Sequence, residues 1–465
     1  MPNKNVNANR LGSNPKATSK RYAIKPSKSA IKVSDRSELW LQASPGELKQ
    51  FGTFADSKQA PIHRWFQYPA GFSYRAVENI LNVHNINRGQ IVYDPFVGTG
   101  TTVVVCKSRG IESYGVEAHP FVHKIASAKT DWSFDLARLI DEANHVTFEL
   151  DLTRNRSAQI DTRVMPELVR KCFSEPNLRD LIYIRDYIDQ NVKTKYRLLF
   201  QVALVCALRQ ASAAATGWPY IAPKKRIKEK DGLETFKRQL FLMIDDLKNI
   251  PPEVRLTPSH IILGDARDCH LPDDFFDLSF TSPPYLNNYD YADRTRLETY
   301  FNGYASSWND ITEKIRSQLI ISATTQINRS EYNTEDIISD LIKSSEPKVA
   351  KLLQESVTTL SARRLEKNGK KSYDILVGQY FNDMAMTLAD NLRVLKKRAH
   401  FVLILGDSAP YGIHIPTEEY LGRIGVGLGF QNFHIQKLRN RGEKWKGNSQ
   451  RHHLALKETV LTLEK

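Results

Sequence analysis

Apolar residues recur along this chain in two patterns, short runs and helical spacing. Short runs bounded by polar residues or glycine predict strands at 91–93, 113–116 and 400–405. Four further strands are expected in HIILGDARD, FFDLSFTSPPY, FQNFHIQKL and ETVLTLEK, the last two as an antiparallel pair. Helical spacing lies between these runs. The alternation of seven strands with helices predicts an α/β protein whose sheet is mostly parallel and covered by helices.

Two long polar and helical stretches interrupt this alternation. Residues 122–257 and 303–372 are too long to be loops of a compact domain, and we interpret both as helical insertions. The strands therefore fall into three parts, which are 39–121, 258–302 and 373–465. Residues 1–38 are rich in Asn, Ser and Lys with few large apolar residues, which is typical of a disordered basic arm.

The charge of the chain favours a polyanionic partner. Lys and Arg number 66 against 52 Asp and Glu, which gives a net charge of +14. Nucleic acid is the usual partner of such an excess. Part of the excess lies in residues 1–36, where it is equally compatible with a solvated tail.

Neither hydropathy nor cysteine usage points to a membrane, to secretion or to a metal site. No apolar run is long enough to span a membrane, and the N-terminus lacks the apolar core of a secretory signal. The four cysteines are scattered without metal-ligand spacing: Cys106, Cys172, Cys206 and Cys269. We therefore expect a cytoplasmic protein with reduced thiols, no bound metal and no membrane partner.

A glycine-rich turn, DPFVGTGTT, follows the first predicted strand and opens a helix expected at 101–108. Glycines there let the backbone approach a ligand, and the helix N-terminus favours an anionic group. Glu117 ends the next strand, where an acid commonly binds a ribose diol, and Asp265 ends the third. The turn lacks the lysine of a P-loop and the third glycine of a dinucleotide fingerprint. It therefore favours a nucleoside with an amino-acid carboxylate; a purely structural turn is the alternative.

A rigid tetrapeptide, Ser-Pro-Pro-Tyr at 282–285, ends another predicted strand. Prolines fix the backbone there, and the tetrapeptide can aim a hydroxyl, a carbonyl and a ring at one planar ligand. Together, DPFVGTGTT and TSPPY resemble the S-adenosylmethionine-dependent DNA amino-methyltransferases of restriction-modification systems, which modify N4 of cytosine or N6 of adenine. The resemblance implies a Rossmann-like methyltransferase sheet of seven strands, the seventh antiparallel, and S-adenosylmethionine as cofactor.

The resemblance also assigns roles to particular residues. Ser282 Oγ and the Pro283 carbonyl would accept the protons of the target amine, with Pro284 fixing the backbone. Tyr285 would stack on a base flipped out of duplex DNA. Cofactor contacts are implied for a set of residues around the strand ends: Phe72, Ser73, Asp94, Pro95, Phe96, Gly98, Gly100, Thr101, Thr102, Glu117 and Asp265.

Several aromatic and polar residues near these motifs have two interpretations. Asn287, Tyr289 and Tyr291 follow the tetrapeptide and would line the entry of the base. For the two tyrosines, packing in the core or stabilising the loop is the alternative. Trp65, before the first strand, would cover the cofactor together with Phe72, or form a hydrophobic staple.

The resemblance gives the parts of the chain their expected roles. Residues 39–121 form the first part of the methyltransferase domain with the cofactor loop, 258–302 hold the catalytic strands, and 373–465 are its C-terminal part. The insertion at 122–257 is a candidate target-recognition lobe. Three basic stretches are candidates for DNA contact, or alternatively solvated faces: GWPYIAPKKRIKEK, ARRLEKNGKK and RNRGEKWKGNSQRHH.

The first residue of the tetrapeptide bears on the target base. By resemblance, Ser is more typical of cytosine-N4 enzymes and Asp of adenine-N6 enzymes, which favours cytosine N4 in duplex DNA. Carbon-5 methylation needs a cysteine, typically after a proline, and none of the four cysteines follows one. Adenine-N6 methylation, RNA base methylation and nucleic-acid binding without catalysis stay open. Cleavage of DNA would need a separate restriction endonuclease as partner.

Overall fold

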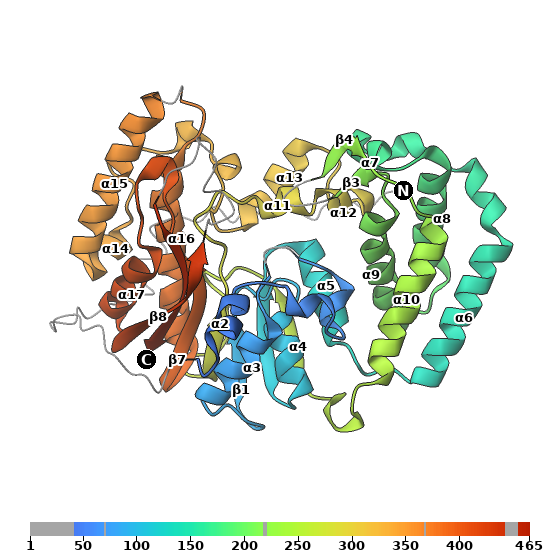
Figure 1. Cartoon of the computed structure of the whole chain (residues 1–465), viewed down its shortest axis with the longest axis horizontal. Coiled ribbons are helices and arrows are strands. Elements are labelled where there is room, and N and C mark those ends of the chain that lie inside the picture. Colours follow the sequence, from blue (N-terminus) through green and yellow to red (C-terminus); the bar gives the residue numbers. More distant parts are fainter. Residues whose placement is uncertain (1–40, 69–70, 217–220, 367–368, 442–453) are drawn as a thin grey trace, which may run out of the picture.

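The computed structural model describes residues 41–68, 71–216, 221–366, 369–441 and 454–465. The basic arm expected at 1–38 lies outside this part of the chain. In the described residues, a sheet at the centre of the molecule has a helical lobe on one side and a second group of helices on the other (Figure 1).

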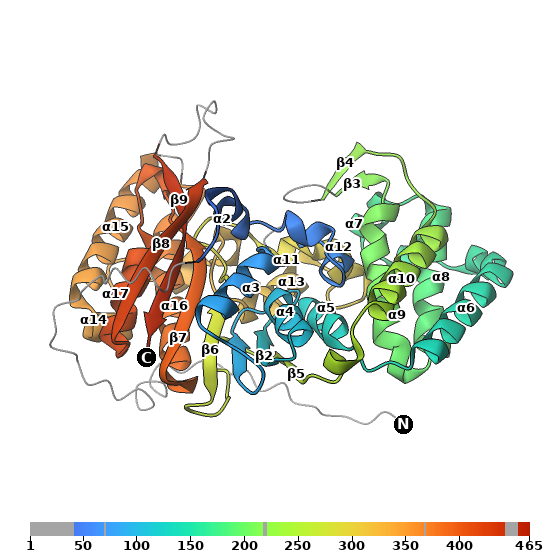
Figure 2. The ribbon, with the colours of Figure 1, turned by 60° about the horizontal axis from the view of Figure 1, so that its bottom comes forward.

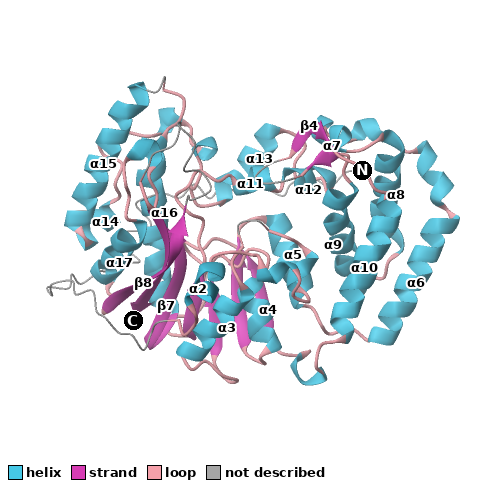
Figure 3. Ribbon diagram, in the orientation of Figure 1, coloured by secondary structure: helices cyan, strands magenta, loops and turns pink. Residues whose placement is uncertain are grey.

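The central sheet is mostly parallel (Figure 3). Its strands within the described ranges are, in spatial order, β5 (Ser259–Leu263), β2 (Glu112–Glu117), β1 (Ile91–Asp94), β6 (Phe276–Thr281), β7 (Leu395–Gly406), β9 (Leu456–Glu464) and β8 (Asn432–Arg441). Neighbours pair in parallel except β9, which is antiparallel to β7 and β8. The predicted α/β fold with a seven-stranded Rossmann-like sheet is thereby confirmed. Strand order reverses between β1 and β6, the position where such sheets bind ligands at their carboxyl ends.

Helices cover both faces of the sheet. One face carries α2 (Pro45–Phe51), α3 (Tyr74–Val83), α4 (Thr101–Ser108) and α5 (Pro120–Thr130), and the other carries α16 (Tyr373–Val394) and α17 (Thr417–Leu428), with α14 (Asp340–Ser345) and α15 (Pro347–Glu366) packed against α16. Side chains alternate between the faces along each strand. In β7, Val402 and Ile404 pack in the core between the sheet and α2–α4. Phe401 and Leu403 pack in the core on the other face, beneath α16 and α17.

The expected insertion at 122–257 is a helical lobe beside the sheet (Figure 2). It comprises α6 (Leu136–Leu152), α7 (Glu167–Cys172), α8 (Glu175–Asn191), α9 (Thr194–Ala211) and α10 (Gly232–Lys248). Its expected start falls inside α5, which packs on β2 and β5 and therefore belongs to the sheet. The lobe also contains an antiparallel pair that the helical pattern did not predict, β3 (Ala214–Ala215) and β4 (Ala222–Arg226), because β3 directly continues the alanine-rich sequence of α9.

The second insertion is shared between two cores. After the tetrapeptide come α11 (Tyr291–Arg294), α12 (Arg296–Phe301) and α13 (Trp308–Lys314). Ile311 and Ile315 pack into the core of the helical lobe, whereas Ile320, Ile337 and Leu353 pack under α16 in the core of the sheet. The stretch expected as one unit at 303–372 therefore bridges the lobe and the sheet across the carboxyl ends of the strands.

Candidate active site

Two glycines shape the turn between β1 and α4, each for a different reason. Gly98 has a φ of +53° and Gly100 a φ of +92°, conformations that other residues rarely adopt. A Cβ at Gly98 would come within 4 Å of only one other described atom, the carbonyl oxygen of Phe96 at 3.8 Å, so a ligand can approach the backbone. A Cβ at Gly100 would lie 3.4 Å from the Cα of Ala126, so Gly100 lets α4 and α5 pack closely.

The carboxylate of Asp94 ties the glycine loop to the strand before the tetrapeptide. Asp94 is fully buried. Its Oδ1 accepts hydrogen bonds from Thr281 Oγ1 (2.6 Å) and the Phe96 N–H (3.0 Å), and its Oδ2 accepts one from Thr102 Oγ1 (2.5 Å). Burial raises the pKa of Asp94 to about 6, and these hydrogen bonds act in the opposite direction. Asp94 therefore fixes the conformation of the loop from a buried position outside the lining of the pocket described below.

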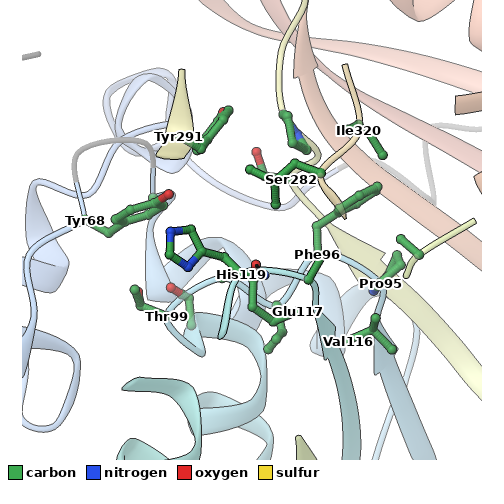
Figure 4. A pocket seen from close by; sticks show the side chains of 18 of the residues that line it. Tyr68, Pro95, Phe96, Thr99, Val116, Glu117, His119, Ser282, Tyr291 and Ile320 are labelled. Carbon is green, nitrogen blue, oxygen red and sulfur yellow. Dashed lines mark hydrogen bonds between the residues drawn. The ribbon is translucent and has the colours of Figure 1, made fainter. Parts of the chain in front are cut away.

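The glycine loop and the tetrapeptide line one pocket (Figure 4). The pocket is partly open to solvent, and the empty space between its walls, open part included, is about 860 Å³. Gly98 and Ser282 both line it. The other walls come from the segment before α3, from the ends of β2 and β5, and from residues 318–320 of the bridging stretch. The two motifs, about 180 residues apart in sequence, thus face one cavity.

Glu117 brings a carboxylate to the pocket at the end of β2. Its Oε1 accepts a hydrogen bond from the His119 N–H at 2.8 Å. Burial raises the pKa of Glu117 to about 7, although backbone N–H groups of His119 and Gly98 act in the opposite direction. A carboxylate with this restricted set of partners is a suitable acceptor for ligand hydroxyl groups.

His119 is a neutral structural contact in the wall of the same pocket. Its Nδ1 accepts the Phe121 N–H at 3.3 Å, so Nε2 carries the proton and donates to Thr295 Oγ1 at 2.8 Å. Burial lowers the pKa of His119 to about 3. His119 therefore links α5 to the segment after the tetrapeptide and does not act as a base near neutral pH.

Asp265 reaches the pocket from the loop after β5. Its carboxylate is bound by the Arg267 guanidinium, with Nε to Oδ1 at 2.9 Å and Nη2 to Oδ2 at 2.7 Å. Arg267 also contacts Asp383 of α16 at 3.0 Å. The orientation of Asp265 is therefore set by a bidentate ion pair with Arg267, which is itself anchored to α16.

The tetrapeptide presents its serine to the pocket and its tyrosine to the far strands. Ser282 is partly buried, and its Oγ lies 3.5 Å from Tyr285 OH. Tyr285 OH donates to Glu458 Oε1 of β9 at 3.0 Å, and the guanidinium of Arg441 lies 5.2 Å from the centre of the Tyr285 ring. Ser282 thus lines the cavity, whereas Tyr285 is fixed by contacts with Glu458 of β9 and Arg441 of β8.

The structure brings most of the expected site residues together. Those that line the pocket are Phe72, Pro95, Phe96, Gly98, Thr101, Glu117, Asp265, Ser282 and Pro284. Those outside the lining are Ser73, Asp94, Gly100, Thr102, Pro283 and Tyr285. Of these, Ser73 caps α3, accepting the Arg75 N–H at 3.1 Å, and Thr102 binds Asp94, so both support the walls.

The aromatic candidates are divided. Tyr291 lines the pocket, whereas Tyr289 is buried with its ring 4.8 Å from that of Tyr291, and Asn287 is exposed. Trp65 faces the helical lobe, where its Nε1 donates to Asp246 Oδ2 at 2.9 Å. Its role is therefore to fix the segment before α3 to α10.

Other lining residues were not expected from the sequence. Tyr68 and His119 belong to short motifs, FQYP and EAHP, that adjoin expected residues and could have been included by proximity. Residues 318–320 carry no comparable local signal. They reach the pocket only because the bridging stretch folds back over the strand ends.

The described residues contain neither a metal cluster nor a membrane span. No three His, Cys, Asp or Glu side chains in the described ranges gather as metal ligands. The four cysteines are free and buried. Across the same ranges, every helix is either too short or too polar to cross a membrane.

Comparisons with known proteins agree with this geometry. The model of a family described as "DNA methylase" matches residues 4–128, which include the glycine loop and Glu117. The type II methyltransferase M.BsoBI of Geobacillus stearothermophilus is 25% identical over 462 residues, covering 89% of this chain and 87% of its own length. The type II methyltransferase M.AvaI of Nostoc sp. is 24% identical over 81% of both chains. M.MvaI of Kocuria varians, also a type II methyltransferase, is 21% identical over 81% of this chain and 82% of its own.

The fold and the shared pocket define an α/β methyltransferase, and the comparisons confirm the resemblance to the amino-methyltransferases. By these comparisons, the chain is similar to DNA methylases and to type II methyltransferases. Methyltransferases of this family generally use S-adenosylmethionine.

Proposed function

We propose that the chain transfers a methyl group from S-adenosylmethionine to N4 of cytosine in duplex DNA, as the modification enzyme of a type II restriction-modification system. The observation that carries this proposal is the shared pocket, which Gly98 lines from the glycine loop and Ser282 from the tetrapeptide. Serine in the first position of the tetrapeptide, by its resemblance to cytosine-N4 enzymes, supports the base. A separate cognate restriction endonuclease is the proposed functional partner.

The pocket suits a nucleoside that carries an amino-acid group. Gly98 leaves its backbone open at the N-terminus of α4, where a carboxylate is favoured. Glu117 offers an acceptor for ribose hydroxyls, and Phe72 and Ile320 offer apolar surface. When bound, S-adenosylmethionine supplies an electrophilic methyl group. The residues of the chain hold that group and the target amine in line, which is the main source of rate in such a reaction.

The tetrapeptide makes the amine a better nucleophile. An exocyclic amine is a poor nucleophile because its lone pair is conjugated with the ring. Ser282 Oγ and the Pro283 carbonyl would accept hydrogen bonds from its two N–H groups and favour a pyramidal nitrogen whose lone pair is free. Pro284 restricts the backbone, so little entropy is lost when these acceptors are used. Tyr285 would stack on the flipped base.

We propose the hairpin of the helical lobe as a DNA contact. Its basic side is formed by Lys224, Lys225, Arg226 and Lys228, all exposed; we call these residues the basic hairpin. The three lysines form no ion pair with any residue of the described ranges. In Figure 1 the hairpin lies on the same side of the molecule as α11–α13, which follow the tetrapeptide. Exposed, unpaired lysines at this position suit the phosphates of a duplex that delivers a base to the pocket.

The product identifies the base. We would incubate the purified chain with duplex DNA and S-adenosylmethionine, digest the DNA to nucleosides and analyse their masses. N4-methylcytosine is the expected product, and N6-methyladenine would overturn the assignment of the base. A parallel reaction with tRNA tests the substrate class, because methylation of tRNA without methylation of DNA would overturn duplex DNA as the substrate.

Ser282→Ala tests the catalytic assignment. The variant should lose methyl transfer and keep its affinity for DNA, since the hydroxyl is proposed to act on the amine and the basic hairpin on the phosphates. An unchanged rate would contradict the role of Ser282.

A further inference from the structure

A carboxylate on a distant strand is connected to the tetrapeptide. Glu458 of β9 is 2% exposed. Its Oε1 accepts the hydroxyl of Tyr285 at 3.0 Å, and its Oε2 accepts Arg439 Nε at 2.6 Å. A register shift in β8 between Lys437 and Arg439 places Arg439 opposite Glu458. Bulges of this kind often reorient a side chain next to an active site.

The ion pair with Arg439 sets the direction of the hydrogen bonds. An ionised carboxylate can only accept, so Tyr285 must donate its hydroxyl proton to Glu458. The Tyr285 oxygen then has lone pairs to accept a hydrogen bond, and Ser282 Oγ lies 3.5 Å away as its donor. The proton of Ser282 is thereby directed toward Tyr285, and its lone pairs remain for another donor in the pocket.

The carboxylate is enclosed by the end of α2. A Cβ built on Gly52 would lie 1.7 Å from Glu458 Oε2, and Arg439 Nη2 donates to the Gly52 carbonyl at 3.2 Å. The backbone at Gly52 therefore covers Glu458 and excludes water from it. Any side chain at position 52 would displace the carboxylate without changing its charge.

We propose that Glu458 is a positioning residue for methyl transfer: through Tyr285 OH it orients the Ser282 hydroxyl so that Ser282 Oγ presents lone pairs to the target amine. This inference rests on the proposed function, in which Ser282 accepts a hydrogen bond from that amine. It gives Tyr285 a second task beside stacking, and it explains why an ion pair is buried behind the tetrapeptide.

Glu458→Gln is the central variant. Arg439 Nε requires an acceptor, so the amide oxygen would face Arg439 and the amide nitrogen would face Tyr285. The amide would donate to the Tyr285 oxygen. The Tyr285 proton would then turn toward Ser282 and occupy one of the two lone pairs of its oxygen, and the Ser282 proton would lose its acceptor. We expect the single-turnover rate of methyl transfer to fall about tenfold or more, with the Kd for DNA and for S-adenosylhomocysteine unchanged.

Two further variants break the connection in other ways. Tyr285→Phe keeps the ring and the ion pair of Glu458 with Arg439, so it tests the hydroxyl even if Glu458→Gln folds poorly. Gly52→Ala displaces the carboxylate. The matched control is Glu418→Gln. Glu418 is a buried glutamate of α17, and it forms an ion pair at 2.7 Å with Lys457, which neighbours Glu458 on β9. Within the described structure, Glu418 is not among the residues that contact the tetrapeptide. The control should transfer methyl at the wild-type rate.

A double-variant cycle separates positioning from a structural role. If Glu458 acts through Tyr285, the variant with both Glu458→Gln and Tyr285→Phe should be no slower than the slower single variant. Independent, multiplicative losses would overturn the proposal, as would wild-type rates in both single variants. Loss of activity in Ser282→Ala together with wild-type rates in both single variants would overturn this inference alone. Full activity in Ser282→Ala would instead overturn the catalytic assignment on which it rests.

Discussion

The hydroxyl of Thr281 donates a 2.6 Å hydrogen bond to the buried carboxylate of Asp94. Thr281 is the residue before the tetrapeptide, and Asp94 is the first residue of the glycine-rich turn DPFVGTGTT. The contact joins β6 to β1, which are neighbours in the sheet, at the point where both strands end. The relative position of the two motifs that share the pocket is therefore set by one short contact and the pairing of two strands.

Loss of this contact should weaken both stability and cofactor binding. Thr281→Val would leave a buried carboxylate without one of its three hydrogen bonds, at a cost of about 1–3 kcal/mol in the free energy of unfolding. Thr281→Ser keeps the hydroxyl and is the matched control. Urea unfolding and the Kd for S-adenosylhomocysteine measure the two effects. Equal values for the Val and Ser variants would contradict the role assigned to the contact.

Cofactor affinity should depend on pH through Glu117. Its pKa is raised to about 7 by burial, so the carboxylate is increasingly protonated below that pH and loses acceptor capacity. The affinity for S-adenosylhomocysteine should fall by up to about tenfold for each pH unit below about 7, and become constant above about pH 8. Calorimetric titration across this range measures the profile. Glu117→Gln should bind weakly with no such profile, and a profile that persists in this variant would assign the titration to another group.

The basic hairpin should control the salt dependence of DNA binding. Removal of Lys224 and Lys225 together should lower affinity for any duplex sequence and reduce the slope of log K against log salt by about 2. Replacing Lys397 and Arg398 with Ala removes the same charge at the amino end of β7, which lies away from the carboxyl ends of the strands where the pocket is. Both side chains are exposed, so this double variant is the matched control. Fluorescence anisotropy over a salt series measures the slopes. Equal slopes in the two double variants would exclude the hairpin from the DNA contact.

Stability should rise with pH because of Lys129. This lysine is 1% exposed, and its Nζ donates to the carbonyls of His63 (3.0 Å) and Phe66 (3.5 Å). Burial lowers the pKa of Lys129 to about 7. Between that pH and about 10.5, the unfolded chain binds a proton that the folded chain does not, so the free energy of unfolding increases with pH.

The comparison with Lys129→Met isolates this effect. The wild type should gain up to about 1.4 kcal/mol per pH unit relative to the variant above about pH 7. Urea unfolding at several pH values from about 7 to about 9 measures the difference. Parallel curves for the two proteins would show that Lys129 does not titrate in this range.

Local signals in the sequence were sufficient for the elements of the sheet. The helix expected at 101–108 is observed with the same ends, since Gly100 adopts a left-handed conformation before it and Gly110 another after it. Ser73, whose side chain can accept a backbone hydrogen bond, caps α3. The glycine loop, Glu117, Asp265 and Ser282 were recognised from residues next to strand ends, and parallel strands bring their carboxyl ends to one edge.

Contacts between distant segments were not readable in the same way. In the second insertion, Ile311 packs against the lobe and Ile320 against the sheet. The two side chains are identical, so their hydrophobicity does not distinguish the two destinations. The same holds for residues 318–320 at the pocket and for Glu458 behind Tyr285. Nothing in the vicinity of these residues in the sequence marks them as parts of a site.

The amino-acid sequence by itself thus determined the order of strands and helices, the two motifs and the class of chemistry, because turns, caps and hydrophobic periodicity act over a few residues. Only the tertiary structure decided that Asp94 supports the loop from behind, that Trp65 serves the helical lobe and that a carboxylate of β9 reaches the tetrapeptide. These outcomes depend on which buried polar groups find partners across the fold, and that pairing is settled by the packing of the whole chain.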